Sequence, residues 1–317
     1  MSVETPDRRT MSPGAWGALI IVYIVWGSTY LGIGIVIETV PPLLGGAIRF
    51  LVASALLASY LALRHGPGVL RVSPRRLGSA ALVGVLLLTA GNGMVAVAEQ
   101  HISTGLTALL VASVPLWLVV FRAATGDRPP FATVAGVLTG FAGVALLSLL
   151  NRGGSGSVLG IVIVLGASLS WAAGSFLSSR LPMPANALVT SVYEMVAGGL
   201  GMVVVATVKG ESLDVAQVSG RSWLALGYLI VFGSLVAFTS YSWLLGNAPI
   251  SLVGTYAYVN PAVAVLLGGL VLSEQVTWPM ILGGAVIIAG VGIVVSTERH
   301  ARPPEPAKSV PADAGRR

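Results

Sequence analysis

The chain is a succession of apolar runs, each about twenty residues long, joined by short polar links. A transmembrane helix needs about 20 apolar residues to cross roughly 30 Å of hydrocarbon. Cutting the sequence at charges, prolines and glycine-polar clusters gives ten such runs, at residues 14–36, 43–63, 77–99, 103–122, 131–150, 158–179, 186–208, 222–245, 250–272 and 278–296. We therefore expect an all-α integral membrane protein with ten transmembrane helices.

The composition supports a surface that faces lipid. Only 9% of the 317 residues are charged and 55% are hydrophobic, whereas soluble domains carry about 25% charged residues. The absence of cysteine excludes disulfides and cysteine-ligated metals, and neither a metal site nor a cofactor is expected. In a membrane protein the net charge of +6 indicates basic loops on one side, so nucleic acid is not an expected partner.

The distribution of Lys and Arg predicts the orientation. If the N-terminus is cytoplasmic, the cytoplasmic segments hold 14 of the 18 Lys and Arg residues, the outer segments hold three, and Arg49 lies within a span. Basic residues accumulate in cytoplasmic loops of membrane proteins. The sequence therefore predicts that both termini are cytoplasmic, in the cell (inner) membrane.

The second half of the chain repeats the first at a nearly constant offset. Trp26 matches Trp171 and Arg49 matches Glu194, both 145 residues apart. Farther along, Pro115 matches Pro261 at 146, Asp127 matches Glu274 at 147, and Gly136 and Gly143 match Gly283 and Gly290 at 147. Similar composition alone would match residues at scattered offsets, so the chain consists of two copies of a five-helix unit.

An odd number of spans means that the second copy enters the membrane from the opposite side. Two inverted repeats are a common plan of secondary transporters, whose site lies near the midplane between the repeats. We expect a cytoplasmic segment at residues 1–13, a first repeat at 14–150, a second repeat at 158–296 and a disordered cytoplasmic tail at 297–317.

Three stretches carry a resemblance to a known family: WGSTYLGIGIVIETVPPLLGGAIRF, GNGMVAVAEQHISTGLTALLVASVPLW and YVNPAVAVLLGGLVLSEQVTWPMILGGAVIIAGV. Together they resemble the EamA family of the drug/metabolite transporter superfamily, and the resemblance extends from about residue 16 to residue 296. It implies ten helices, cytoplasmic termini and export of amino acids or related small metabolites. The family is broad in substrate, so the resemblance does not identify the molecule carried.

Charged residues inside a bilayer mark sites, because a central Arg or Asp costs roughly 2.5–3.5 kcal/mol on insertion scales. Arg49 and Glu194 lie within spans at equivalent positions of the repeats. Both are candidates for a cavity that binds or gates substrate. Arg49 has an alternative interpretation, in which it reaches the membrane surface or bonds loop carbonyls and stabilises the fold.

Asn92 and Glu99 share one face of the third span, seven residues apart. Asn92 is the deeper of the two and is a candidate for the cavity. Glu99 is either a gating charge or a helix-end residue whose carboxylate is satisfied at the outer surface.

Trp26 and Trp171 lie in the middle of the first helix of each repeat. Tryptophan in membrane proteins is enriched at the interfaces, which does not explain two matched positions in mid-span. An indole offers a large rigid face and one N–H donor. The pair either stacks on substrate or closes its path; the alternative is simple helix packing.

The ninth span combines Tyr256 and Asn260 on one face with Pro261. Proline removes an intrahelical hydrogen bond, and Pro115 does the same in the fourth span. Matched breaks in corresponding helices point to a site at the midplane. We predict substrate-binding residues here, with kinks that serve packing alone as the alternative.

Glycines line the fifth and tenth spans, at Gly136, Gly140, Gly143, Gly283, Gly284 and Gly290. Small residues let membrane helices approach closely. These spans are predicted to be packing helices, either within the subunit or between the subunits of a homodimer.

The predicted function is a secondary transporter that exports small metabolites, with H⁺ as a possible coupling ion through Glu194 or Glu99. No phosphate-binding loop precedes a Lys-Ser/Thr pair, so ATP is not expected to drive it. Two alternatives remain: an intramembrane enzyme would need clustered nucleophiles, acids or metal ligands, and a passive channel would need rings of charge or carbonyls.

Overall fold

The structure is a computed structural model and describes residues 12–126, 128–150, 158–248 and 253–300. Within these ranges the regular structure is helical throughout. Eight helical segments of the described chain are long and apolar enough to cross a membrane, and two shorter apolar helices accompany them at residues 131–147 and 259–272. This confirms the predicted all-α fold of ten transmembrane helices.

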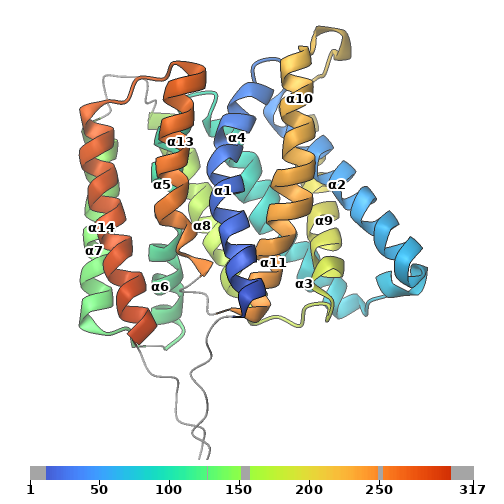
Figure 1. The fold of residues 1–317 in the computed structure, drawn as a ribbon, viewed down its shortest axis with the longest axis horizontal. Helices are drawn as coiled ribbons and strands as arrows, with labels where there is room; N and C mark the ends of the chain where they lie inside the picture. The colour runs from blue at the N-terminus through green and yellow to red at the C-terminus, as the bar shows by residue number, and fades with distance from the viewer. Residues whose placement is uncertain (1–11, 127, 151–157, 249–252, 301–317) are drawn as a thin grey trace, which may run out of the picture.

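The described elements of the first half are α1 (Pro13–Val36), α2 (Pro42–His65), η1 (Pro67–Leu70), α3 (Pro74–Gly84), η2 (Val85–Gly93), α4 (Met94–Ala98), α5 (Thr104–Val111), α6 (Val114–Ala124) and α7 (Phe131–Leu150). Those of the second half are α8 (Val158–Ser178), α9 (Ala187–Lys209), η3 (Val215–Gln217), α10 (Gly220–Tyr228), η4 (Leu229–Phe238), α11 (Thr239–Asn247), α13 (Tyr256–Leu272) and α14 (Trp278–His300). The segments η2 and η4 are π-helical, and they join α3 to α4 and α10 to α11 in continuous spans. We call the end of the bundle where α1 begins, at the bottom of Figure 1, the lower face, and the opposite end the upper face.

Polar residues in the short links start and stop the helices. At the start of α1, the Ser12 hydroxyl accepts a hydrogen bond from the Ala15 N–H, and Pro13 occupies the first turn, where no N–H is needed. Asn186 caps α9 in the same way, and Gly210 ends that helix in a left-handed conformation with φ 71°. The links therefore determine where each span begins and ends.

The helices pair as an inverted repeat requires. Helix α1 packs against α13 of the other repeat, and its equivalent α8 packs against α5 and α6. Two further pairs join a helix to its counterpart in the other repeat: α2 lies against α9, and α7 against α14. Figure 1 shows the α7–α14 pair at one edge of the bundle and α2 and α9 toward the other. The predicted two-fold plan is thus visible in the packing.

The glycines of α7 and α14 serve packing within the chain. A Cβ at Gly136 would stand 2.9 Å from the carbonyl oxygen of Gly290, and one at Gly143 would stand 2.7 Å from the backbone nitrogen of Ile287. Such backbone contact is possible only where a side chain is absent. This glycine face is therefore occupied inside the protein, which favours the first of the two interpretations of these spans.

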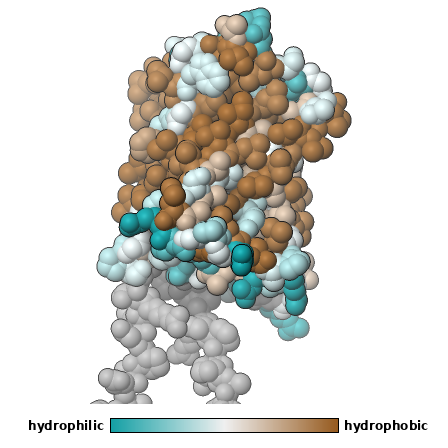
Figure 2. Space-filling view, turned by 90° about the vertical axis from the view of Figure 1, so that its right-hand side faces the viewer, coloured by the Kyte–Doolittle hydropathy of each residue, from teal (hydrophilic) through white to brown (hydrophobic). Residues whose placement is uncertain are grey.

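Apolar side chains cover the outside of the bundle. Leu63, Phe131, Val208 and Leu224 each expose more than three quarters of their surface. In Figure 2 an apolar band covers the middle of one face, and hydrophilic residues gather toward its ends. A surface of this kind is stable in lipid rather than in water. The chain is accordingly a multi-pass membrane protein.

Candidate functional site

A cavity lies in the middle of the bundle, between the two repeats. It encloses about 60 Å³ and is lined by side chains of both halves of the chain. The lining residues are Trp26, Thr29, Tyr30, Ile33, Arg49, Phe50, Leu88, Gly91, Asn92, Val95, Val111, Ala167, Ser168, Trp171, Gly233, Phe238, Tyr256 and Asn260. Six of the sequence-predicted residues are among them: Trp26, Arg49, Asn92, Trp171, Tyr256 and Asn260.

The cavity continues toward the upper face. A second, smaller cavity shares Ile33, Arg49 and Asn92 with the first and extends to Ile37 and Pro42, where α1 ends and α2 begins. The two cavities together extend from the centre of the bundle toward its upper end.

The two π-helical segments border this cavity at equivalent places in the repeats. Their first residues, Val85 and Leu229, are 144 apart, and their last, Gly93 and Phe238, are 145 apart. A π-helix shifts the register of the backbone and frequently occurs at functional sites. Both segments contain residues that line the cavity, so the π-helical backbone occurs where the two repeats meet.

Arg49 enters the cavity from α2. Its Nε donates to the hydroxyl of Ser234 at 2.9 Å, and its Nη1 donates to the Asn92 side-chain oxygen at 3.4 Å. The guanidinium carbon lies 4.6 Å from the centre of the Phe50 ring. Only 3% of the residue is exposed. Arg49 therefore bonds side chains inside the bundle and does not reach the membrane surface, which decides against the alternative interpretation.

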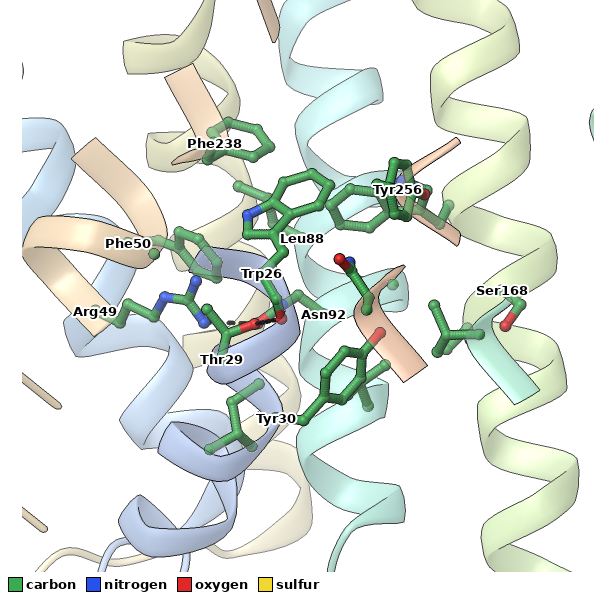
Figure 3. A pocket seen from close by; sticks show the side chains of 18 residues that line it. Trp26, Thr29, Tyr30, Arg49, Phe50, Leu88, Asn92, Ser168, Phe238 and Tyr256 are labelled. Carbon is green, nitrogen blue, oxygen red and sulfur yellow. Dashed lines mark hydrogen bonds between the residues drawn. The ribbon is translucent and has the colours of Figure 1, made fainter. Parts of the chain in front are cut away.

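The bare backbone of Gly233 gives the guanidinium its place. A Cβ added at Gly233 would stand 2.8 Å from Nη2 of Arg49. Because a carbon cannot approach nitrogen so closely without displacement, any other residue here would push the guanidinium away. Figure 3 shows the charged group pointing toward Asn92 and Thr29.

Four aromatic rings gather at the end of the cavity nearer the lower face. The Trp26 ring lies 5.4 Å from Trp171, 4.7 Å from Tyr241 and 5.4 Å from Tyr256, measured between ring centres. The Tyr241 hydroxyl accepts a hydrogen bond from Trp171 Nε1 at 3.1 Å and bonds the Ser175 hydroxyl at 2.7 Å. Three of these rings, Trp26, Trp171 and Tyr256, line the cavity, and we call the group of four the aromatic plug.

The two prolines differ in their effect on the backbone. Pro115 stands in the first turn of α6, directly after a turn at Ala112–Ser113 that separates α5 from α6. Pro261, by contrast, lies inside the continuous helix α13. The expected helix break at Pro261 is therefore corrected: the chain turns at Gly254–Thr255. One missing N–H does not end a helix whose other backbone bonds are kept.

Asn260 connects α13 to α1. With its amide nitrogen placed to donate, it bonds the carbonyl oxygens of Tyr23 at 3.1 Å and Tyr256 at 3.3 Å. Asn260 is 3% exposed. Its amide thus fixes the crossing of two helices that carry plug residues, while the residue also lines the cavity.

Glu194 lies outside the cavity in this conformation. Its side chain is fully buried in the lower half of the bundle, where the Ser242 hydroxyl donates to Oε2 at 2.6 Å. The other carboxylate oxygen has no hydrogen-bond partner among the described residues. The expectation that Glu194 lines the cavity is thus corrected for this state, because Glu194 is not among the residues that line it.

Glu99 also differs from its expected environment. Both of its carboxylate oxygens are buried and have no hydrogen-bond partner among the described residues, so it is not a satisfied helix-end residue. Glu274 lies within its electrostatic range and accepts bonds from the Thr104 N–H at 2.8 Å and the Gly105 N–H at 3.2 Å. Two acids therefore lie close together near the upper face, and only Glu274 caps a helix.

Several cavity residues were not predicted from the sequence. Ser234 matches Thr89 at the repeat offset of 145, and Tyr30 follows Trp26 by one helical turn, so both had a detectable signal. Gly233, Ser168 and Phe238 had none, because such residues are common in membrane helices. Within the described ranges, no three His, Asp or Glu side chains gather as a metal site would require.

Comparison with known proteins assigns the family. The EamA-like transporter family matches this chain twice, at residues 14–149 and 158–296. The uncharacterized inner membrane transporter YedA of Escherichia coli strain K12 is 40% identical over 295 residues, which cover 92% of this chain and 93% of YedA. The uncharacterized transporter YvbV of Bacillus subtilis is 25% identical over the same shares of both chains.

More distant similarities agree. A WAT1-related chloroplastic protein of Arabidopsis thaliana is 24% identical over 88% of this chain and 69% of its own. One crystal structure has a similar fold, with a TM-score of 0.66 and 20% identity, and the match covers 92% of this chain and 100% of that one. From the family match over both repeats, the protein belongs to the EamA-like transporter family and is a membrane transporter, not an enzyme.

Proposed function

We propose that this protein exports small metabolites, foremost amino acids and their analogues, across the inner membrane by alternating access. The observation that carries the proposal is the cavity between the inverted repeats, with a path toward the upper face and an aromatic plug toward the lower face. A carrier site closed on one side at a time has this arrangement.

The size of the cavity supports a conformational cycle. Its volume is about 60 Å³, while one water molecule already needs roughly 10–15 Å³ on this measure. The cavity is thus small for a bulky amino acid, and we propose that the helices around it move apart to admit one. Inverted repeats supply a second state of similar energy, in which the equivalent helices exchange their conformations.

The orientation follows from the basic residues. The links at the lower face carry most of the Lys and Arg, including Arg64, Arg71, Arg75 and Arg76 between the second and third spans. We therefore infer that the lower face is cytoplasmic and that the path in this conformation leads outward.

The lining of the cavity suits an amphipathic solute. Arg49 and Asn92 offer polar contacts, and Trp26, Trp171 and Tyr256 offer flat apolar surfaces. Glu194 and Glu99 are the acids that a coupling proton can use, since each has a buried carboxylate oxygen without a hydrogen-bond partner in the described chain. We propose proton coupling through Glu194, which lies between the plug and the cytoplasmic side.

Purified protein in liposomes tests the transport activity. Vesicles loaded with an unlabelled amino acid should take up the labelled one by counterflow, and vesicles without protein should not. A panel of apolar, aromatic and polar amino acids defines the range. If no member of the panel or its analogues shows protein-dependent flux under any gradient, the proposed function is wrong.

Single cysteines test the access path, because the chain contains no cysteine of its own. Ile33 lines both cavities, so Ile33→Cys should react with a membrane-impermeant maleimide added outside, and a transported amino acid should slow the reaction. Ile287 is fully buried in the second repeat and provides the matched control, Ile287→Cys, which should not react. Labelling of Ile33→Cys from the cytoplasmic side alone would reverse the proposed orientation or state.

A further inference from the structure

The guanidinium of Arg49 ends in the cavity with its charge unpaired. A guanidinium has five N–H donors, and the two hydrogen bonds to Ser234 and Asn92 leave three of them for another partner. Both acceptors are neutral. The ion pairs found in the described chain join Lys209 to Glu211 and Arg221 to Glu38, and neither includes Arg49.

No acidic side chain faces the guanidinium across the cavity. Among the described residues, those that line it include one cation and no Asp or Glu. Glu194 lies behind the plug, bonded by Ser242, and Glu99 lies among upper-face residues outside the lining. The cavity therefore carries a net positive charge from its own side chains.

A buried cation without a counter-charge is costly, and a bound anion removes that cost. Guanidinium binds carboxylate through two parallel N–H···O bonds, and the Nη N–H groups that Asn92 leaves over are available for such a fork. Gly233 and Phe50 hold the group in one position, so the fork is prepared before the ligand arrives.

The rest of the cavity is suited to the uncharged, apolar part of a ligand. Trp26, Tyr256 and Phe238 lie at one end, and Figure 3 shows their rings grouped away from Tyr30. Aromatic faces attract an ammonium group weakly, by about 0.5–2 kcal/mol. They do not replace the carboxylate that a selective ammonium site needs, because a cation that loses its water requires a strong acceptor.

We propose that Arg49 selects substrates by their carboxylate, and that the α-ammonium group is not required. The substrate class is then monocarboxylates with an apolar body, which includes apolar amino acids and also their deaminated analogues. This inference rests on the proposed function, since it names the chemical group by which the same cavity recognises its substrate.

Ligands matched in shape test the proposal on the purified protein by calorimetric titration. One series is L-phenylalanine, 3-phenylpropanoate and 2-phenylethylamine, and a second is L-leucine, 4-methylpentanoate and 3-methylbutylamine. We expect the amino acid and the acid to bind within about tenfold of each other in at least one series, and the amine at least about a hundredfold more weakly. An amine that binds as well as the acid, or an acid that does not bind in either series, overturns the proposal.

Variants at Arg49 and Asn92 locate the effect. Arg49→Lys keeps the charge but loses the fork, and should weaken acid binding about tenfold. Asn92→Asp is nearly isosteric and places a carboxylate beside Nη1, so it should compete with the ligand and weaken binding at least about tenfold. The matched variant Asn92→Ala removes the 3.4 Å hydrogen bond without adding a charge, so it should weaken binding clearly less than Asn92→Asp does.

These outcomes separate the inference from the proposed function. Selective acid binding without flux in liposomes would leave carboxylate recognition standing and refute transport. Flux that does not distinguish acids from amines, or that is the same in Asn92→Asp and Asn92→Ala, would refute carboxylate recognition and leave transport standing.

Discussion

Arg49 and Glu194 occupy equivalent positions in the two repeats, yet their surroundings differ in almost every respect. Arg49 projects into a cavity and bonds Ser234 of the other repeat, with donors left over. Glu194 is enclosed by protein and bonds Ser242 of its own repeat. The two charges thus occupy the same position in two copies of one unit, but only Arg49 lines the cavity.

The different surroundings of Arg49 and Glu194 show that the internal symmetry does not make the two halves of one conformation alike. The repeats relate two conformations of the protein to each other, and within one conformation the upper and lower halves need not look alike. In this state the upper half has the path and the lower half has the plug. When the repeats exchange conformations, we expect α9 to meet the cavity as α2 does here, so that Glu194 then faces it.

The largest effects on stability are expected at the two glycines that contact Glu194 and Arg49. Gly84 lies against the backbone of Glu194, and an added Cβ would collide with its carbonyl oxygen and stand 2.6 Å from its Cα. Backbone cannot rotate away as a side chain can, so Gly84→Ala should cost about 3 kcal/mol of unfolding free energy. Thermal unfolding in detergent measures it.

Gly233 contacts the flexible end of Arg49, so Gly233→Ala should cost clearly less stability but weaken ligand binding. The control Gly78→Ala has open space around its Cβ and should be near neutral. If Gly233→Ala destabilises the protein more than Gly84→Ala does, the proposed difference between the surroundings of Arg49 and Glu194 is wrong.

The next largest effect is expected on proton-driven transport. Glu194→Gln keeps the shape and the bond to Ser242 but cannot gain or lose a proton. We expect proton-driven flux in liposomes to fall at least about tenfold, with counterflow kept within about twofold, since Glu194 does not line the cavity in this state. Loss of both activities would instead place Glu194 in substrate binding and make it resemble Arg49.

The two serines that hold the charges provide a matched pair. Ser234→Ala removes the acceptor of Arg49 Nε and should weaken binding of a carboxylate ligand about fivefold, because the guanidinium loses its fixed orientation. Ser242→Ala removes the hydrogen bond to Glu194 and should leave that binding unchanged. Equal effects of the two variants in calorimetric titration would contradict the assignment of Arg49 alone to ligand recognition.

The sequence predicted the features that depend on length and symmetry. Ten spans followed from apolar runs, and the pairing of Arg49 with Glu194 followed from one offset. The π-helical segments did not, because a shift in backbone register leaves no characteristic residue type. Such shifts depend on neighbouring helices: Ser170 of α8 donates to the Leu86 carbonyl at 2.9 Å, inside η2.

Glu99 shows a second limit of prediction from sequence. Its position beside a short loop suggested an exposed helix end. In the structure α1 passes next to it: a Cβ added at Gly34 would lie 3.8 Å from a Glu99 carboxylate oxygen, which is an ordinary contact distance. Burial of this kind arises from a helix some 65 residues away in sequence, and no local pattern reports it.

The smallest expected effect tests whether the aromatic plug keeps the two charges in different surroundings. Tyr241→Phe keeps the ring beside Trp26 but removes the hydroxyl that bonds Trp171 and Ser175. Losing these bonds should destabilise the closed plug by about 1 kcal/mol, which shifts some molecules to the state open toward the lower face. The reactivity of Ile33→Cys toward maleimide added outside should then fall, by no more than about half.

Tyr60→Phe, at a half-exposed position on the outside of α2, is the control and should leave this reactivity unchanged. If reactivity stays the same in Tyr241→Phe, the hydroxyl does not hold the plug, and packing of the four rings alone must separate Glu194 from the cavity.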